Sequence, residues 1–341
     1  MRLPQARGPL SAHVLEVLRA EPSPALPDAA WASQVAAVAD VLGDEDFQLA
    51  LWLLFEVHYR GFEGVPDHEW DPHVVALRAA LTDRFEAELR SCTEDVVGQA
   101  LDASDDLVEQ VTVVIDTVDG PSVARHLQRE ASREEVVDFM RQRSLYHLKE
   151  SDPHAFVVPR IDGRAKVALA ELQYDEYGAG RPERLHSRLF VDALDACGLD
   201  STYGAYVEEV PGHTLAVNNI MSLFGLSRRL RGAALGHLAA FEATSSAPCR
   251  RIAAGIERVG LPDVVAAYFH EHVEADAVHE QVAIRDICGG LLEDHPALRT
   301  DVLFGVAACL HLDVLAAEGL LATWRDARDA SADLRAASRV A

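Results

Sequence analysis

Apolar residues recur with a helical period in nearly every segment between the proline and glycine breaks of this chain, and this pattern most constrains its fold. Ala, Leu, Glu and Arg, which favour helices, dominate these segments. VTVVI at 111–115 admits a short strand, but its flanks follow a helical pattern and favour helix. The sequence therefore predicts an all-α fold, with helices at 10–20, 28–42, 45–60, 72–90, 93–102, 104–117, 121–130, 132–150, 163–177, 182–197, 214–224, 226–243, 247–259, 262–294, 295–319 and 321–337.

A break at Gly120-Pro121, followed by sharper helix signals, divides the chain into two parts. The segment SREE opens a helix with a serine, Ser132, and a glutamate three residues later, which predicts a capping box. We expect an N-terminal helical region at 1–130 and a C-terminal helical domain at 131–341.

The charge balance narrows the classes of partner. Acidic residues outnumber basic ones 55 to 31, and the resulting net charge of -24 repels phosphate backbones and anionic lipid. The longest apolar stretch, 302–321, is interrupted by His311, Asp313 and Glu318, so it suits a buried core helix better than a membrane span. Five scattered cysteines and an N-terminus without an apolar signal core indicate a reducing compartment. We therefore expect a cytoplasmic protein that binds neither nucleic acid nor membrane.

The strongest local signal is the spacing of His272, Asp276 and His279. On a helix, positions i, i+4 and i+7 fall on one narrow stripe. Two imidazoles and a carboxylate aimed at one point suit a divalent transition metal, and the carboxylate-rich surroundings favour iron or manganese over zinc. Exposed polar residues on an acidic helix would give the same spacing, so this motif alone leaves both interpretations open.

A second group of candidate ligands surrounds a glycine-rich break at 178–180. Glu183 and His186 are spaced i and i+3 on the helix predicted to start at Pro182, so they could share a metal. Glu176 ends the preceding helix, where the glycine break could turn its carboxylate inward. The competing interpretation is that Glu183 stabilises the first turn of its helix and that Glu176 is a solvated helix end.

Glu242 stands alone in an apolar helical stretch. A buried acid needs a partner because unpaired burial is costly. A metal would supply one, and so would an arginine such as Arg228 or Arg231. Glu56 and His58 are two residues apart and point to different helix faces, so we interpret them as a core or boundary pair rather than as ligands.

The chain carries, in order, Glu176, the E-x-x-H motif that ends at His186, Glu242, and the H-x-x-x-D-x-x-H stripe that begins at His272. This order resembles the haem-oxygenase-like diiron oxidases and oxygenases. The segments LKESDPH (148–154), ELQYDEYGAG (171–180) and AFEATSSAP (240–248) also resemble bacterial proteins described as iron-containing redox enzymes. The similarity covers roughly 132–294. It implies that residues 131–341 form a haem-oxygenase-like helical bundle, to which 1–130 is an extra helical region. It also implies metal ligands at Glu176, Glu183, His186, Glu242, His272, Asp276 and His279, with Glu150 where the family can place one further acid.

The same resemblance implies two Fe2+ ions per chain and dioxygen as co-substrate. It further implies a small organic substrate, an electron donor, and oxidation by N-oxygenation, desaturation or C–C cleavage, and it leaves a homodimer open. Tyr174, Tyr177 and Arg184 are predicted, from their position in the sequence, to orient the ligand histidines. The alternatives are a ferritin-like diiron fold, a metal-free oxidase or tetrapyrrole-binding protein of the haem-oxygenase-like fold, and a non-enzymatic helical interaction module.

Overall fold

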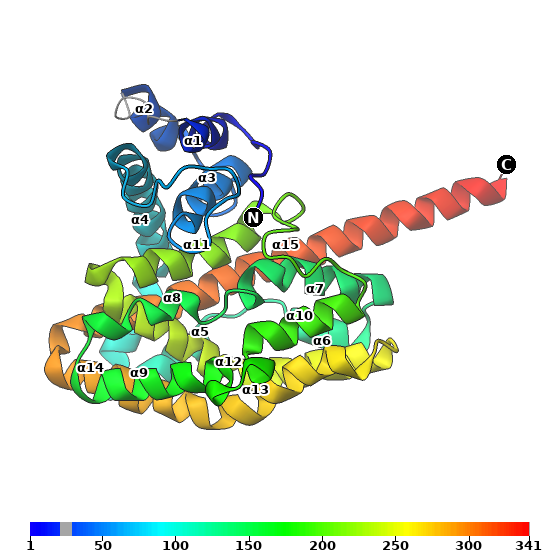
Figure 1. Ribbon diagram of the computed structural model, residues 1–341. Helices are drawn as coiled ribbons and strands as arrows, with labels where there is room; N and C mark the ends of the chain where they lie inside the picture. The colour runs from blue at the N-terminus through cyan, green and yellow to red at the C-terminus, as the bar shows by residue number, and fades with distance from the viewer. Residues whose placement is uncertain (21–28, 341) are drawn as a thin grey trace.

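The structure is a computed structural model that describes residues 1–20 and 29–340, without the side chains of Ala29, 274–278 and 332–340. Every regular element in this described part is a helix, which confirms the predicted all-α class (Figure 1). The segment 111–115 lies in a helix rather than a strand. The N-terminal helices are α1 (Pro9–Arg19), α2 (Ala29–Ala37), α3 (Glu45–Glu56), α4 (Pro72–Ala103), α5 (Leu107–Thr117) and α6 (Val123–Arg129).

The rest of the chain adds the longer helices that surround the site. The predicted capping box is present at the start of α7, because Ser132 and Glu135 each accept a hydrogen bond from the other's backbone N–H. The helices are α7 (Arg133–His147), α8 (Asp152–Ala155), α9 (Gly163–Glu176), α10 (His186–Ala196), α11 (Gly212–Leu226), α12 (Arg231–Arg258), α13 (Asp263–Gln281), α14 (Gly289–Asp294) and α15 (Arg299–Val340), with 3-10 turns at 158–160, 178–180, 182–184, 228–230 and 296–298.

Three predicted interruptions were wrong. α4 runs unbroken through Thr93, whose buried hydroxyl donates to the Leu89 carbonyl within the helix. α12 continues past Pro248, because its packing against α13 and α15 holds both halves in line although one backbone hydrogen bond is lost. α15 likewise continues past Gly319, since one glycine weakens a helix without ending it.

One predicted helix, 262–294, contains a change of geometry that its sequence pattern does not reveal. α13 passes into a π-helical segment, η5 (Val282–Cys288), before α14 resumes the ordinary helical geometry. A π-helical turn is wider than an α-helical one and is often found at functional sites. η5 packs against α9 and α12, so one face of the widened segment is buried in the fold while Arg285 faces solvent.

α12 is the central helix, and it packs against α13 on one side and against α15 on another (Figure 1). Glycines make the crossing with α15 close, because a Cβ at Gly236 would collide with the Val302 carbonyl and one at Gly305 with the Ala233 carbonyl. This close crossing leaves one face of α12 for α13, and the candidate site lies between these two helices and α7, α9 and α10.

The N-terminal helices pack on the C-terminal ones, with α3 against α11 and with α4 and α5 against α15. One hydrophobic cluster extends from Leu10 in α1 to Leu312 in α15. The division of the chain at residue 130 stays a prediction.

α15 contains the longest apolar stretch of the described chain. The span Pro296–Ser331 is long and apolar enough to cross a membrane by length and composition, and 50% of its most apolar window is buried inside the structure. Its first half packs within the fold, and its C-terminal part extends away from the body of the molecule (Figure 1).

Candidate metal centre

A tight turn after α9 brings the first acid and the first histidine together. Gly178, Ala179 and Gly180 all have positive φ, so the chain reverses within three residues. A Cβ at Gly178 would lie 2.6 Å from the backbone nitrogen of Leu185, so only glycine allows this approach. The turn places His186 Nδ1 3.0 Å from the Glu176 Oε2 atom, and both side chains are buried.

α13 supplies two more histidines from one face. His272 and His279 are both buried, and each faces carboxylates from other helices. His272 Nε2 lies 3.4 Å from Glu150 Oε1, while His279 Nδ1 lies 3.5 Å from Glu242 Oε2 and 3.9 Å from Glu176 Oε1. The i and i+7 spacing therefore directs both rings toward one region of the interior.

These side chains form two donor sets that share one carboxylate. Within each set, the candidate ligand atoms all lie within 4.8 Å of one another. Glu176 belongs to both sets, so it lies between them. We call the whole group the carboxylate–histidine cluster; its first set is Glu150, Glu176, His186 and His272, and its second is Glu176, Glu242 and His279.

The acids of the first set are held in their charged form. Burial alone would raise the pKa of Glu150, but His272 and His147 outweigh it and hold that pKa well below its usual range. Burial likewise opposes ionisation of Glu176, and the neighbouring His186 outweighs it and lowers its pKa. Buried negative charge therefore accumulates in the cluster.

The pKa values of two histidines are raised, which favours their positively charged forms and compensates that negative charge. Burial disfavours the charged form of His279, but Glu242 and Glu176 outweigh it and raise its pKa to about 9. Burial also opposes protonation of His186, and Glu176 outweighs it and raises that pKa. At neutral pH His279 is thus protonated, and its proton occupies a nitrogen atom that a metal ion would otherwise use.

Residues outside the donor sets orient the cluster. The Tyr268 hydroxyl contacts both oxygens of Glu150 at 2.9 Å and lies 2.6 Å from His147 Nδ1. His272 Nδ1 lies 2.8 Å from the Tyr268 carbonyl, which can only accept, so Nδ1 carries a proton and Nε2 faces Glu150. The Asp175 carboxylate lies 3.4 Å from His279 Nε2 and orients that ring. Such partners typically fix the tautomer and orientation of metal-binding histidines.

The donor set fits a metal ion. The buried Nδ1 atoms of His186 and His279 face carboxylate oxygens, yet neither makes a well-directed hydrogen bond within the described part of the chain. Buried polar atoms are normally hydrogen-bonded, so converging nitrogen and oxygen atoms of this kind indicate a binding site for a cation. Mixed imidazole and carboxylate donors suit iron, and carboxylate-bridged iron pairs in helical bundles draw acids and histidines from several helices.

The structure brings together most of the residues that the sequence singled out, and it brings Glu150 to them from the turn after α7. Of the arginines named as alternative partners of Glu242, Arg231 donates to the Arg228 carbonyl, and Glu242 lies against His279. The prediction for Asp276 lies outside the described side chains. The cluster contains Glu176, His186, Glu242, His272 and His279.

Glu183 does not reach the cluster. The predicted helix from Pro182 does not form, because Leu185 is extended (φ -56°, ψ 124°) and α10 begins only at His186. Glu183 therefore lies in an exposed 3-10 turn on a different element from His186, and the i, i+3 argument does not apply. The acid that contacts His186 is Glu176 instead.

The predicted orienting residues were also different from the observed ones. Tyr174 donates to the Ala179 carbonyl, Tyr177 to Asp152, and Arg184 to Glu271, all near the surface. Tyr268 and His147 take the orienting positions instead. A signal for Tyr268 exists in the sequence, since it lies one helical turn before His272, but His147 gives no comparable pattern.

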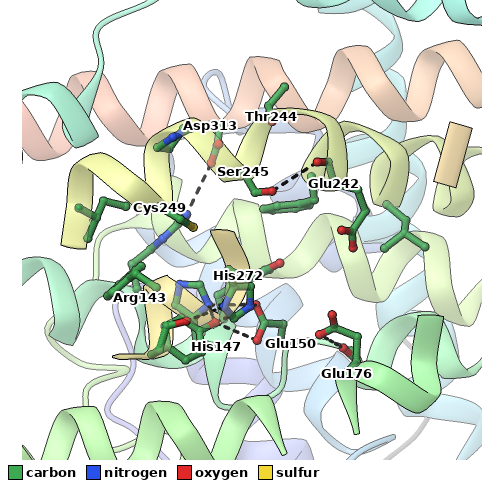
Figure 2. A pocket seen from close by; sticks show the side chains of 18 of the residues that line it. Arg143, His147, Glu150, Glu176, Glu242, Thr244, Ser245, Cys249, His272 and Asp313 are labelled. Atoms are coloured by element: carbon green, nitrogen blue, oxygen red, sulfur yellow. Dashed lines mark hydrogen bonds and ion pairs between the residues drawn. The ribbon is translucent and has the colours of Figure 1, made fainter. Parts of the chain in front are cut away.

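A cavity that holds about 120 Å³ of space for water-sized molecules, and is partly open to solvent, reaches the cluster; we call it the cluster cavity. Glu150, Glu176 and His272 lie on one side of it, and Glu242 reaches toward them from α12 (Figure 2). Aromatic and aliphatic side chains cover much of the remaining wall, among them Phe139, Leu172, Leu238, Phe241 and Phe269. A few convergent polar groups in a largely apolar pocket are typical of small-molecule sites.

Comparison with known proteins is consistent with this geometry. A family profile described as iron-containing redox enzyme matches residues 137–314, more than half of the chain. A nitrosourea synthase of Streptomyces achromogenes subsp. streptozoticus is 30% identical over 148 residues, which are 43% of this chain and 31% of that protein. The chain thus matches about a third of the length of that relative. A CADD-like protein of unknown function from Nostoc punctiforme PCC 73102 superimposes with a TM-score of 0.45 and 17% identity over 69% of this chain and 97% of that one.

Proposed function

The chain belongs to the haem-oxygenase-like family of iron-containing redox enzymes, and we propose that it is a non-haem diiron oxidase or oxygenase. In this proposal it holds two Fe2+ ions, receives electrons from a donor, and uses dioxygen to oxidise a small organic substrate. Membership of the family indicates an oxidoreductase that contains iron. The number of iron ions, the use of dioxygen and the reaction are the parts that we propose.

The observation that carries the proposal is the sharing of Glu176 between two donor sets. One carboxylate between two groups of nitrogen and oxygen atoms is the arrangement that a pair of metal ions requires. The first set contributes two carboxylates and two imidazoles, and the second contributes two carboxylates and one imidazole. A mononuclear site would need only one of these sets.

Iron bound at this site would supply the dioxygen activation and electron transfer that side chains cannot perform. The residues of the chain have different tasks. Tyr268 and His147 hold the Glu150 carboxylate, and the Tyr268 carbonyl keeps a proton on His272 Nδ1 so that Nε2 is available. The aromatic wall of the cluster cavity limits access of water to the reacting groups.

The reaction class is proposed from the relatives. The name of that relative, a nitrosourea synthase, indicates chemistry at nitrogen and supports N-oxygenation as one option, alongside desaturation and oxidative C–C cleavage. All three use the same iron-dependent activation of dioxygen and differ in which substrate atom lies next to the cluster.

The test is anaerobic loading with Fe2+ and metal analysis, followed by stopped-flow absorption on mixing with dioxygen. We expect about two iron ions per chain and a transient visible band. His272→Ala should lose both. His270→Ala is the matched control, because His270 is an exposed histidine two residues away that pairs with Glu257 outside the cluster.

Absence of iron uptake and of the transient in the wild-type protein would overturn the proposal. A Soret band after addition of haem, with no uptake of free iron, would favour a tetrapyrrole-binding protein instead. If His272→Ala changed stability but not metal content, the cluster would be a structural polar network.

A further inference from the structure

A second cavity adjoins the cluster cavity, and we call it the side cavity. It holds about 340 Å³ of space for water-sized molecules and lies between α7, α12 and α15 and the segment 118–124. Seven residues line both cavities, so the two spaces meet along a common wall: Phe139, Arg143, Tyr146, Thr244, Pro248, Ile252 and Asp313.

Arg143 carries the positive charge at this junction. Of the described residues that line the two cavities, it is the one lysine or arginine. Its guanidinium carbon lies 5.5 Å from the Tyr146 ring centre and 5.9 Å from that of Phe139, so aromatic faces hold it in place. The surrounding charge is acidic, with the cluster carboxylates on one side and Asp313 on the other (Figure 2).

The pairing of Arg143 within the protein is incomplete. Its nearest carboxylate oxygen belongs to Asp313 at 3.8 Å, longer than the roughly 2.7–2.9 Å of a charge-assisted hydrogen bond. The side chain of Asp313 is 43% exposed, so solvent competes for it. The Nε atom of Arg143 is buried and makes no hydrogen bond within the described residues. Guanidinium groups donate only, so the missing partner is an acceptor.

We propose that Arg143 binds the carboxylate of the organic substrate, and that the two cavities form one binding site with Arg143 at their junction. The inference rests on the proposed function, since it names the substrate class of the same site. A planar carboxylate matches the two parallel donors of a guanidinium. A single positive charge among acids suits a monoanion better than a phosphate dianion, which needs more cationic donors.

The side chains that line the rest of the two cavities indicate the polarity of the substrate beyond its carboxylate. Beyond Arg143, the cluster cavity is lined by Leu172, Leu238 and Phe241, and the side cavity by Val314 and Leu320. A carboxylic acid with a mainly apolar body fits both walls. With its carboxylate at Arg143, the body extends into the cluster cavity, so the atom that is oxidised lies several bonds from the carboxylate.

Asp313 then acts as the internal competitor. It occupies Arg143 loosely in the absence of substrate and gives it up when a carboxylate arrives. Arg143 and Asp313 consequently have opposite effects on affinity, because one attracts the ligand and the other competes with it. A role in folding alone would not produce opposite signs.

The test is calorimetric titration of the metal-free protein with straight-chain carboxylates from butanoate to decanoate. The corresponding neutral amides serve as controls for apolar contact. We expect at least one carboxylate to bind more tightly than its amide. Arg143→Gln should weaken that binding at least tenfold, Arg143→Lys should weaken it less, and Asp313→Asn should tighten it two- to fivefold. Arg188→Gln, in an exposed arginine paired with Asp192, should leave the affinity unchanged.

Equal binding of carboxylate and amide, equal loss of affinity in Arg143→Gln and Asp313→Asn, or no carboxylate binding in the series would overturn the inference. Because the titration uses metal-free protein, its result does not depend on iron uptake. Failure of the diiron proposal and failure of the carboxylate site are therefore distinguished.

Discussion

Lys149 and Glu150 are neighbours in the sequence, yet they belong to two buried polar groups of opposite kinds. Lys149 is 2% exposed and pairs directly with Glu56 of α3, which is fully buried. Tyr203 donates to the same Glu56 oxygen at 2.8 Å, and the Lys149 ammonium lies 4.1 Å from the Tyr59 ring centre. We call this group the lysine cluster. Glu150 instead faces the histidines of the carboxylate–histidine cluster.

The difference lies in how each group balances its charge. The lysine cluster pairs one positive with one negative side chain, and the Tyr203 hydroxyl and the Tyr59 ring add further contacts. The carboxylate–histidine cluster has three acids and balances them with exchangeable protons on imidazoles. A buried group whose opposite charges pair with each other stabilises one fold. A buried group whose charge is balanced by protons can exchange those protons for a metal ion.

The largest effect should come from Glu176→Gln. Because Glu176 belongs to both donor sets, we expect this change to abolish stoichiometric iron binding, measured by metal analysis after anaerobic loading. Glu183→Gln is the matched control, since Glu183 is an exposed acid on the neighbouring turn and should leave iron binding unchanged. Iron loss in Glu183→Gln with iron retained in Glu176→Gln would reverse the assignment.

Next in size is Lys149→Met. It leaves the charge of Glu56 buried without its partner, so we expect the free energy of unfolding to fall by about 3–5 kcal/mol. Denaturant titration measures this change. Lys166→Met, in a lysine that is 39% exposed and pairs with an exposed aspartate, should change the free energy of unfolding by less than about 0.5 kcal/mol. A loss of the same size in both variants would contradict a closed lysine cluster.

The smallest effect is a dependence of iron affinity on pH. The folded pKa of His279 is raised to about 9 from 6.5, so a metal must displace its proton at neutral pH. Affinity for Fe2+ should therefore rise between pH 6.5 and 8, by up to about tenfold per pH unit for each proton displaced. The contribution of His279 to the stability of metal-free protein runs the other way: it is complete below pH 6.5 and is lost as the pH rises toward 9.

Two measurements check that pair of opposite trends. Anaerobic Fe2+ titrations across the pH range give the affinity, and denaturant unfolding of metal-free protein gives the stability. Iron affinity that does not change over this pH range would mean that metal binding displaces no proton from His279 or His186.

The sequence predicted the parts of the site that lie on regular helices. The spacing of His272 and His279 predicts that both rings lie on one face, and α13 keeps its helical period between them. Glu242 follows from its isolation in an apolar stretch of α12. Glu183 was chosen wrongly because Pro182 is favourable at a helix start, whereas the glycine-rich turn delays α10 to His186.

Long-range contacts explain what the sequence could not predict. Glu150 lies in the turn after α7, and only the approach of Tyr268 and His272 from α13 shows that its carboxylate is buried. Pro248 marks a break by its local chemistry, but helices on either side of α12 hold the chain straight. In both cases the deciding contacts come from residues about one hundred positions away or from whole neighbouring helices.

The π-helical segment η5 begins three residues after His279, and it has a consequence for how this part of the chain can change length. A π turn contains one residue more than an α turn, so it sets the angular phase between the residues before it and those after it. Both kinds of turn make one revolution, so removing one residue from 282–288 would restore an α-helical turn and leave the angular position of His279 nearly unchanged. A second deletion would have no extra residue to absorb it and would rotate one side relative to the other by roughly 100°. Since η5 is packed against α9 and α14, that rotation would fall on α13 and carry His279 away from Glu242. The extra residue of η5 therefore allows this part of the chain to lose one residue before the register of the metal centre changes.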